Sequence, residues 1–110
     1  KPYIKSGTID DWKKDLSLCA TFENVSCKIS GLVTEADWNN WKADDFTPYL
    51  DVVMEQFGPK RLLYGSDWPV CILAASYEQQ MNILDAYIAK LSDSEKTLIM
   101  GGNAISFYNL

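Results

Sequence analysis

The sequence predicts an α/β fold in which two short parallel strands alternate with longer helices. Residues 25–30 and 61–66 carry strand signals, and stretches with apolar residues at helical spacing precede, separate and follow them. Because helices of ten or more residues accompany the strands, we expect βαβ units and a parallel sheet. The expected order along the chain is helix, strand, helix, strand, helix, helix.

The first helix is predicted from about residue 9 to residue 20, where apolar side chains recur at helical spacing. Thr8 followed three residues later by Asp11 resembles a capping box at its start, with Asp in place of Glu. The first strand is predicted from strict alternation of apolar and polar side chains over residues 25–30, and Gly31 ends it.

The second helix is predicted over residues 45–57, with Pro48 tolerated in its first turn. Gly58 and Pro59 end this helix, because neither residue continues one readily. The second strand is predicted over residues 61–66, where its apolar side chains lead into a polar end.

Two further helices and a short terminal one are predicted after the second strand. Ser76 is expected to cap the third helix, and Ser92 with Glu95 forms a capping box for a fourth. The glycine pair at residues 101–102 is expected to end the fourth helix, and a short helix follows from Asn103.

Two strands are too few for a complete sheet of this kind. A two-stranded parallel sheet leaves both outer edges unpaired, and parallel sheets need cover on both faces. The sequence therefore indicates that these strands either pair with strands of another polypeptide or belong to a larger protein.

The composition argues against several classes of partner. The net charge is −5, and the ten Lys and Arg residues form no basic stripe that could neutralise a phosphate backbone. The longest apolar stretches, such as residues 70–75, are too short to span a bilayer. No secretory leader is visible at Lys1 and Pro2. We expect a cytoplasmic protein with no nucleic-acid or membrane partner.

The cysteine and histidine content narrows the chemistry. Cys19, Cys27 and Cys71 form no C-x-x-C pair and are expected to be reduced and mostly buried small hydrophobes. The chain contains no histidine. Neither a histidine-based zinc site nor a Ser or Cys nucleophile with an imidazole base can therefore be assembled within these 110 residues alone.

Asp67 is the clearest catalytic candidate, because it directly follows the second strand, where α/β barrels place their catalytic groups. Alternation puts it on the same face as Leu63 and Gly65, and Gly65 would leave space beneath its carboxylate. There Asp67 could act as a general base toward water or as a metal ligand. Alternatively, Asp67 caps the turn that begins at Trp68.

The polar face of the first strand carries Lys28 and Ser30. If the apolar face packs against outer helices, Lys28 points inward, where an ammonium needs a carboxylate partner or an anionic substrate. Otherwise the segment is an edge strand and Lys28 faces water. A group of aromatic residues could line a pocket for a cyclic substrate or simply pack under the loops: Trp38, Trp41, Trp68 and Tyr77.

Residues 60–70, which read KRLLYGSDWPV, resemble the amidohydrolase-related family called amidohydrolase 2, within its branch of L-fuconolactonase and L-rhamnono-lactonase type sugar-lactone hydrolases. Residues 24–32, NVSCKISGL, resemble the seventh strand of that family. Matches also occur at residues 57–59, 103–104 and 107–108. The resemblance implies that residues 1–110 are the C-terminal segment of a single (β/α)₈ TIM-barrel domain, with strands 7 and 8 and their flanking helices.

The resemblance also implies a function and its residues. Asp67 matches the aspartate at the end of strand eight, which in metal-dependent relatives helps to bind a divalent metal such as zinc and takes a proton from the hydrolytic water. Some members of this branch need a divalent metal and others do not, so the resemblance implies the general-base role first, with or without a metal. The implied activity is hydrolysis of a small cyclic ester, a sugar-acid lactone. Lys28 and Ser30 would orient the substrate and Trp68 would line its pocket. Lys1 and Pro2 resemble the positions just after an Asp-His pair, so the remaining metal ligands would lie outside this chain.

Two other functions stay open at this point. Relatives in the wider family use the same aspartate for decarboxylation. A non-enzymatic alternative is an inactive barrel fragment that only self-associates through its exposed strand edges.

Overall fold

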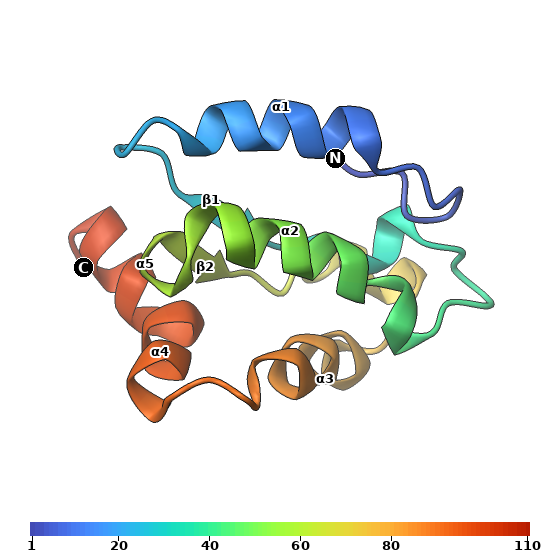
Figure 1. Cartoon of the computed structure of the whole chain (residues 1–110). Coiled ribbons are helices and arrows are strands. Elements are labelled where there is room, and N and C mark those ends of the chain that lie inside the picture. Colours follow the sequence, from blue (N-terminus) through green and yellow to red (C-terminus); the bar gives the residue numbers. More distant parts are fainter.

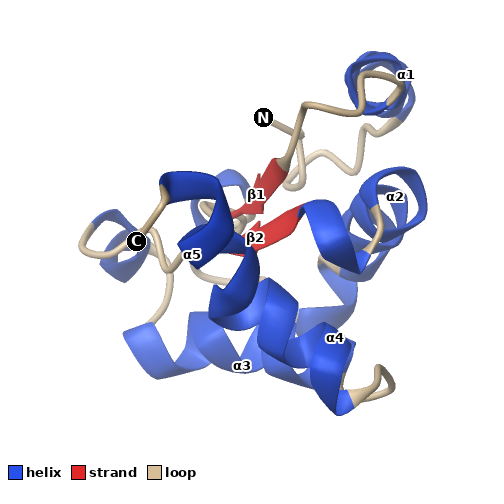
Figure 2. Cartoon of the chain, turned by 90° about the vertical axis from the view of Figure 1, so that its left-hand side faces the viewer, coloured by secondary structure: helices blue, strands red, loops and turns tan.

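A two-stranded parallel sheet lies at the centre of the computed structural model, which describes residues 1–110. Strand β1 spans Cys27–Ile29 and strand β2 spans Leu62–Tyr64. Figure 2 shows the strands in the middle, with α1 and α2 to one side, α3 and α4 below and α5 beside them. The predicted parallel pairing is confirmed, with the partners Cys27 and Leu62, Lys28 and Leu63, and Ile29 and Tyr64.

Helices α1 (Asp10–Ala20) and α2 (Thr47–Phe57) run side by side along one side of the sheet (Figure 1). The rings of Trp12 and Tyr49 pack between them, with centroids 5.4 Å apart. The Tyr49 hydroxyl lies 3.3 Å from the carbonyl oxygens of Tyr3 and Thr8, which ties α2 to the N-terminal segment. Pro48 sits in the first turn of α2 as predicted, where its missing N–H costs no helical hydrogen bond.

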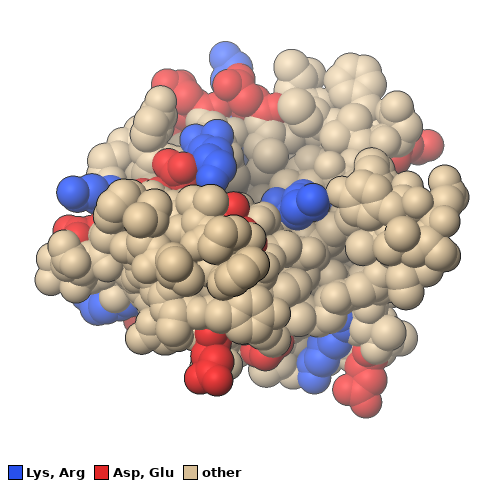
Figure 3. All heavy atoms as spheres, turned by 180° about the vertical axis from the view of Figure 1, so that it is seen from behind, with Lys and Arg blue, Asp and Glu red and all other residues tan.

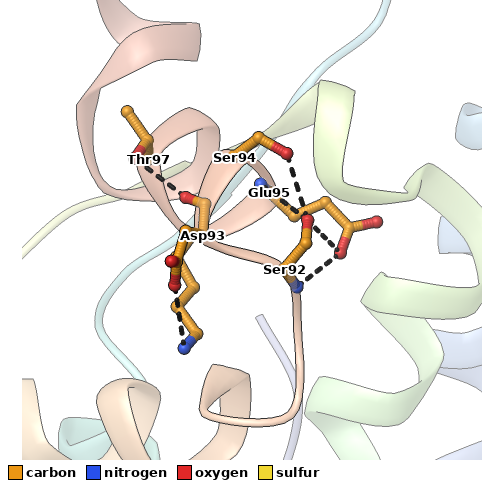
Figure 4. A network of polar contacts seen from close by, with 6 residues as sticks. Ser92, Asp93, Ser94, Glu95 and Thr97 are labelled. Atoms are coloured by element: carbon orange, nitrogen blue, oxygen red, sulfur yellow. Dashed lines mark hydrogen bonds and ion pairs between the residues drawn. The ribbon is translucent and has the colours of Figure 1, made fainter.

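Helix α3 (Tyr77–Ile88) begins at the predicted cap, because the Ser76 hydroxyl accepts a hydrogen bond from the Gln79 N–H. Helix α4 (Asp93–Thr97) begins at the second predicted capping box. There the backbone N–H of Glu95 donates to Ser92 Oγ, and the N–H of Ser92 donates to the Glu95 carboxylate (Figure 4). Both serines therefore satisfy helix N–H groups that would otherwise lack partners.

The expected break at the glycine pair is wrong. Residues Leu98–Gly102 form a π-helical turn that connects α4 directly to α5 (Asn103–Tyr108). A glycine can end a helix by adopting a positive φ, but neither glycine of this pair does so. The helix continues because both glycines keep helical backbone angles.

The start of α1 also differs from its prediction. Ile9 is the capping residue, and no side chain caps the helix. Thr8 is unavailable because its backbone forms an antiparallel bridge with Tyr3, while its hydroxyl oxygen accepts a hydrogen bond from Ser6.

Both strands are shorter than the alternation predicts, and Arg61 gives the reason. Residues Pro59–Arg61 form a 3₁₀ turn, so they do not extend β2. The carbonyl of Val25, which a partner strand would bind, instead accepts a hydrogen bond of 3.0 Å from the guanidinium of Arg61. At the other end, the N–H of Gly65 donates to the Ile29 carbonyl at 3.0 Å and continues the ladder by one bond.

The core fills the space between the sheet and the helices. Four side chains are almost completely buried: Phe46, Leu62, Cys71 and Ile99. Among the cysteines, Cys71 is buried as expected, but Cys19 is exposed and Cys27 is only partly buried, so the expectation of mostly buried cysteines is wrong. None of the helices has both the length and the apolar character that crossing a bilayer requires.

Candidate active site

The C-terminal ends of the two strands bring together Ser30, Gly31, Gly65, Ser66 and Asp67, which we call the strand-end site. β1 and β2 are parallel neighbours, and the Gly65 N–H to Ile29 carbonyl bond holds the two chain segments side by side as they leave the sheet. In α/β proteins ligands bind at this end of parallel strands. The fold therefore places Asp67 at the end of the sheet where α/β proteins hold their ligands.

The backbone of Asp67 has an unusual conformation, with φ at 57°. This left-handed region is uncommon for residues other than glycine, although aspartate tolerates it better than most. The Asp67 carbonyl accepts a hydrogen bond of 2.8 Å from the Cys71 N–H, and the Trp68 N–H donates to Ser66 Oγ at 3.2 Å. These bonds hold the backbone of the loop after β2 on both sides of Asp67.

The carboxylate of Asp67 has one oxygen, Oδ2, that is buried and has no hydrogen-bond partner. Neither carboxylate oxygen bonds to the turn that follows, and the 3₁₀ turn Val70–Leu73 has no side-chain cap. The alternative that Asp67 caps this turn therefore has no supporting contact. An unpaired buried carboxylate oxygen is unfavourable in isolation, which makes it a good acceptor for a ligand.

Gly31 provides the space for this carboxylate. It is buried and has φ at 70°, and a methyl group on its Cα would lie only 3.2 Å from Asp67 Oδ2. The same methyl group would lie 2.5 Å from Lys1 Nζ. Lys1 also forms an ion pair with Glu35 at 3.5 Å. The space over Gly31 is therefore bordered by a carboxylate and an ammonium.

Lys28 and Ser30 lie on the face of β1 that borders Gly65. A methyl group on Gly65 would lie 2.9 Å from Ser30 Oγ and 3.2 Å from Lys28 Cδ, so these side chains occupy the space at Gly65. The ammonium of Lys28 lies 5.6 Å from the ring centroid of Tyr108 on α5, a cation–π contact. Lys28 is exposed in this structure.

The four aromatic residues of the sequence prediction do not have one common environment. Trp41 packs under the loops, with its ring 5.4 Å from that of Phe46 and its Nε1–H donating to the Ala74 carbonyl at 2.8 Å. Trp68, directly after Asp67, is 65% exposed, and Trp38 and Tyr77 are exposed as well. Of the four, Trp68 is adjacent in sequence to the strand-end site.

A pocket of about 160 Å³ lies between α1, α2 and β1, and both lysines and Ser30 contribute to its walls. Its remaining lining is mainly apolar and includes Trp12 and Leu16. Figure 3 shows that the surface opposite to that of Figure 1 is hollowed, with basic and acidic side chains beside the hollow.

Burial favours the neutral forms of two titratable side chains on the strands, Tyr64 and Cys27. Burial raises the pKa of the Tyr64 phenol, and the hydrogen bond from the Gln80 side chain opposes this shift only in part. Burial also raises the pKa of the Cys27 thiol, which disfavours the nucleophilic thiolate. No three His, Cys, Asp or Glu side chains come together as a possible metal site. Among the five residues of the strand-end site, Asp67 is the single carboxylate.

The amidohydrolase family model known as amidohydrolase 2 matches residues 1–110. The chain belongs to this amidohydrolase family. This confirms the family that the residues around Asp67 predicted.

Two curated relatives of this amidohydrolase chain are lactonases. The chain is 42% identical over 120 residues to the L-fucono-1,5-lactonase of Burkholderia multivorans, covering 100% of this chain and 40% of the relative. It is 36% identical over 115 residues to the L-fucono-1,5-lactonase of Burkholderia ambifaria, covering 100% of this chain and 39% of the relative. The chain thus spans about two fifths of the length of these relatives.

A solved structure shows the same fold. A crystal structure of an amidohydrolase from Burkholderia multivorans with bound zinc superimposes with a TM-score of 0.90 at 39% sequence identity. The match covers 100% of this chain and 41% of that one. The mixed helix and strand arrangement therefore corresponds to part of a larger amidohydrolase.

Sequence reasoning did not identify Glu35 or the role of Gly31 in the site. The sequence predicts only that Gly31 ends a strand, and Lys1 only resembles a position just after the Asp-His pair of the family. The glycine that ends the predicted strand of residues 25–30 is the one available signal, because a conformationally permissive residue at a strand end can also permit a close approach. Nothing in the sequence pattern connects Glu35 with Lys1.

Proposed function

We propose that the full-length protein hydrolyses a sugar-acid lactone and that Asp67 is its general base. The observation that carries this proposal is the buried, unpartnered Oδ2 of Asp67 at the C-terminal end of β2. The lactonase activity named for two relatives that match the whole chain supports the substrate class.

In this proposal β1 and β2 are strands 7 and 8 of a (β/α)₈ barrel, and residues 1–110 are the C-terminal segment of that domain. Their parallel pairing and their flanking helices support the assignment. The outer edges of both strands, which no strand of this chain covers, would pair with the other barrel strands.

The proposed reaction requires one proton acceptor. The Asp67 carboxylate accepts a proton from water while the water oxygen bonds to the lactone carbonyl carbon, and the carbonyl π electrons move onto the carbonyl oxygen. When the tetrahedral intermediate collapses, the ring C–O bond breaks and the leaving ring oxygen takes the proton from Asp67. The product is the open hydroxy acid, and Asp67 returns to its carboxylate form.

Lys28, Ser30 and Trp68 are proposed to bind the substrate. The Ser30 hydroxyl and the Lys28 ammonium offer hydrogen-bond donors to sugar hydroxyls or a carboxylate, and both line the pocket beside β1. The exposed ring of Trp68 offers an apolar surface next to Asp67.

A divalent metal such as zinc fits this site in part. Asp67 Oδ2 has the chemistry of a metal ligand, since it is an oxygen without a hydrogen-bond partner. The chain brings together no three His, Cys, Asp or Glu side chains as a metal site, so further ligands would come from the rest of the domain. A bound divalent ion supplies Lewis acidity toward a carbonyl oxygen.

Replacing Asp67 by Asn in the full-length protein tests the general-base role. We expect kcat for sugar-acid lactones, measured as acid release at constant pH, to fall by about 100-fold or more, because general-base catalysis contributes about that much. Asp15→Asn, an exposed carboxylate on α1, is the matched control and should keep full activity. Undiminished turnover by Asp67→Asn would remove Asp67 from the mechanism.

A further inference from the structure

The ammonium of Lys1 and the carboxylate of Asp67 face the same small space. Both border the position that a side chain on Gly31 would occupy, with Lys1 Nζ 2.5 Å and Asp67 Oδ2 3.2 Å from that point. These two residues lie 66 positions apart in the sequence, and the absence of a side chain at residue 31 allows them to approach each other.

The two charges nevertheless do not form an ion pair. The only carboxylate within 4.0 Å of Lys1 Nζ is that of Glu35, and Asp67 Oδ2 stays without a partner. The ammonium is thus held close to Asp67 without neutralising it. A small polar group that contacts both Lys1 Nζ and Asp67 Oδ2 would therefore bridge the two charges.

Glu35 and the N-terminal segment together hold Lys1 in place. The carbonyl of Glu35 accepts a hydrogen bond of 2.9 Å from the Lys5 N–H, while its side chain forms the ion pair with Lys1. Pro2 and Ile4 are buried between these contacts. Glu35, the last residue of the 3₁₀ turn Val33–Glu35, therefore holds the N-terminal segment through both its backbone and its side chain.

We propose that Lys1 is a further catalytic residue, whose ammonium stabilises the oxyanion that forms on the lactone carbonyl oxygen. This inference rests on the proposed lactonase function. As water attacks and its proton passes to Asp67, negative charge develops on the carbonyl oxygen, and Lys1 donates a charge-assisted hydrogen bond to it. Glu35 is the positioning residue, because it orients Lys1 without contacting the substrate.

Lys28 does not fit this role as well. Its ammonium lies over the ring of Tyr108 on the C-terminal helix, and its side chain passes Gly65 rather than Gly31. Lys28 therefore lies beside Gly65 and the Tyr108 ring, whereas Lys1 lies beside Gly31 and the Asp67 carboxylate.

The test uses the full-length enzyme with the variant Lys1→Met. We expect kcat to fall by about 100-fold or more with KM changed by less than about threefold, because an oxyanion donor acts in the transition state. Lys1→Arg, which keeps a cation, should retain more activity than Lys1→Met. Lys14→Met, an exposed lysine on α1, is the matched control and should keep wild-type kinetics.

Glu35→Gln tests the positioning role of Glu35. It also replaces Lys1→Met as the deciding variant if Lys1→Met lowers the unfolding temperature of the enzyme. We expect it to lower kcat about tenfold or more at nearly constant KM, since the ammonium stays but is no longer held. Unchanged kcat in Lys1→Met, or in Glu35→Gln if Lys1→Met is unstable, would overturn the inference. So would a rise in KM alone, which indicates ordinary substrate binding.

The two proposals fail in different ways. An inactive wild-type enzyme, or an active Asp67→Asn variant, would contradict the lactonase mechanism as a whole. An active wild type with an inactive Asp67→Asn and a fully active Lys1→Met would leave that mechanism in place and contradict only the role of Lys1.

Discussion

Gly31 and Gly65 follow neighbouring strands, and each makes room for different polar groups. The space at Gly31 is bordered by the Asp67 carboxylate, whereas the space at Gly65 is filled by Ser30 and Lys28. At the scale of single residues, the strand-end site therefore depends on two missing side chains. A substitution at either position acts directly on the polar groups around it.

Gly65→Ala should destabilise the full-length protein by about 1–3 kcal/mol, the usual cost of adding a methyl group to a tightly packed position. The new methyl group would lie 2.9 Å from Ser30 Oγ and 3.0 Å from Ser30 Cβ, so the side chain or the backbone of Ser30 must shift. Chemical denaturation measures the change in the free energy of unfolding.

Gly101→Ala is the matched control for this prediction. A methyl group there would have no atom within 4 Å, and the residue lies in a helical turn, so stability should stay the same or rise slightly. Equal effects of both substitutions would show that contact with Ser30 is not the cause.

Asp67 could be proposed from the sequence because it directly follows the predicted strand of residues 61–66 within a recognisable family motif. Its environment could not be predicted in the same way. Glu35 lies 34 positions after Lys1, and no spacing rule connects two surface residues across such a distance. The positive φ of Asp67 depends on the hydrogen bonds of its loop, which only the folded structure reveals.

At the scale of secondary-structure elements, Arg61 connects three of them. Its guanidinium donates to the carbonyls of Ala20 at the end of α1, Val25 before β1 and Gln56 near the end of α2. It also donates to the Phe22 carbonyl and lies 5.0 Å from the centroid of the Phe57 ring. One side chain thus satisfies several carbonyls that no strand or helix partner takes.

Arg61→Lys should therefore be a severe substitution. A lysine carries the charge but lacks the planar fork that reaches several carbonyls, so we expect a loss of about 2–3 kcal/mol in the free energy of unfolding. Lys60→Met, at the exposed neighbouring position, should change stability by less than about 0.5 kcal/mol. Urea denaturation compares the variants, and near-equal stabilities would contradict the role of Arg61.

Element types were largely predictable, whereas their ends were not. Ser76 and Ser92 indicated two helix starts correctly, because a capping box is a local pattern. Thr8 carried a similar pattern but uses its backbone in a bridge to Tyr3, a contact that local spacing does not encode. The strand ends depend on Arg61, which acts on residues far from it in the sequence.

At the scale of the whole molecule, the sheet has two strands and each leaves one edge without a partner. Several large apolar side chains are also exposed, among them Ile72 at 62% and Phe107 at 55%. The sequence predicted two parallel strands and also that two strands are too few for a complete sheet. It could not specify what covers the free edges, because the pairing partners of a strand lie outside its own pattern.

The isolated polypeptide of residues 1–110 should self-associate, because it exposes strand edges and apolar surface together. Light scattering coupled to size exclusion at several concentrations should give a mass above 12.4 kDa that rises with concentration. A monomer at every concentration, with a single cooperative unfolding transition, would contradict this expectation.

The π-helical turn at Leu98–Gly102 has a consequence for the catalytic candidate itself. One extra residue in a helical turn rotates everything after it by roughly 100° about the axis. Asn103 follows directly, and its amide donates to the carbonyls of Pro59 and Leu62, at the beginning of β2. The tail of the chain therefore anchors the near end of the three-residue strand whose far end presents Asp67, so disorder in the last helix would spread to the carboxylate.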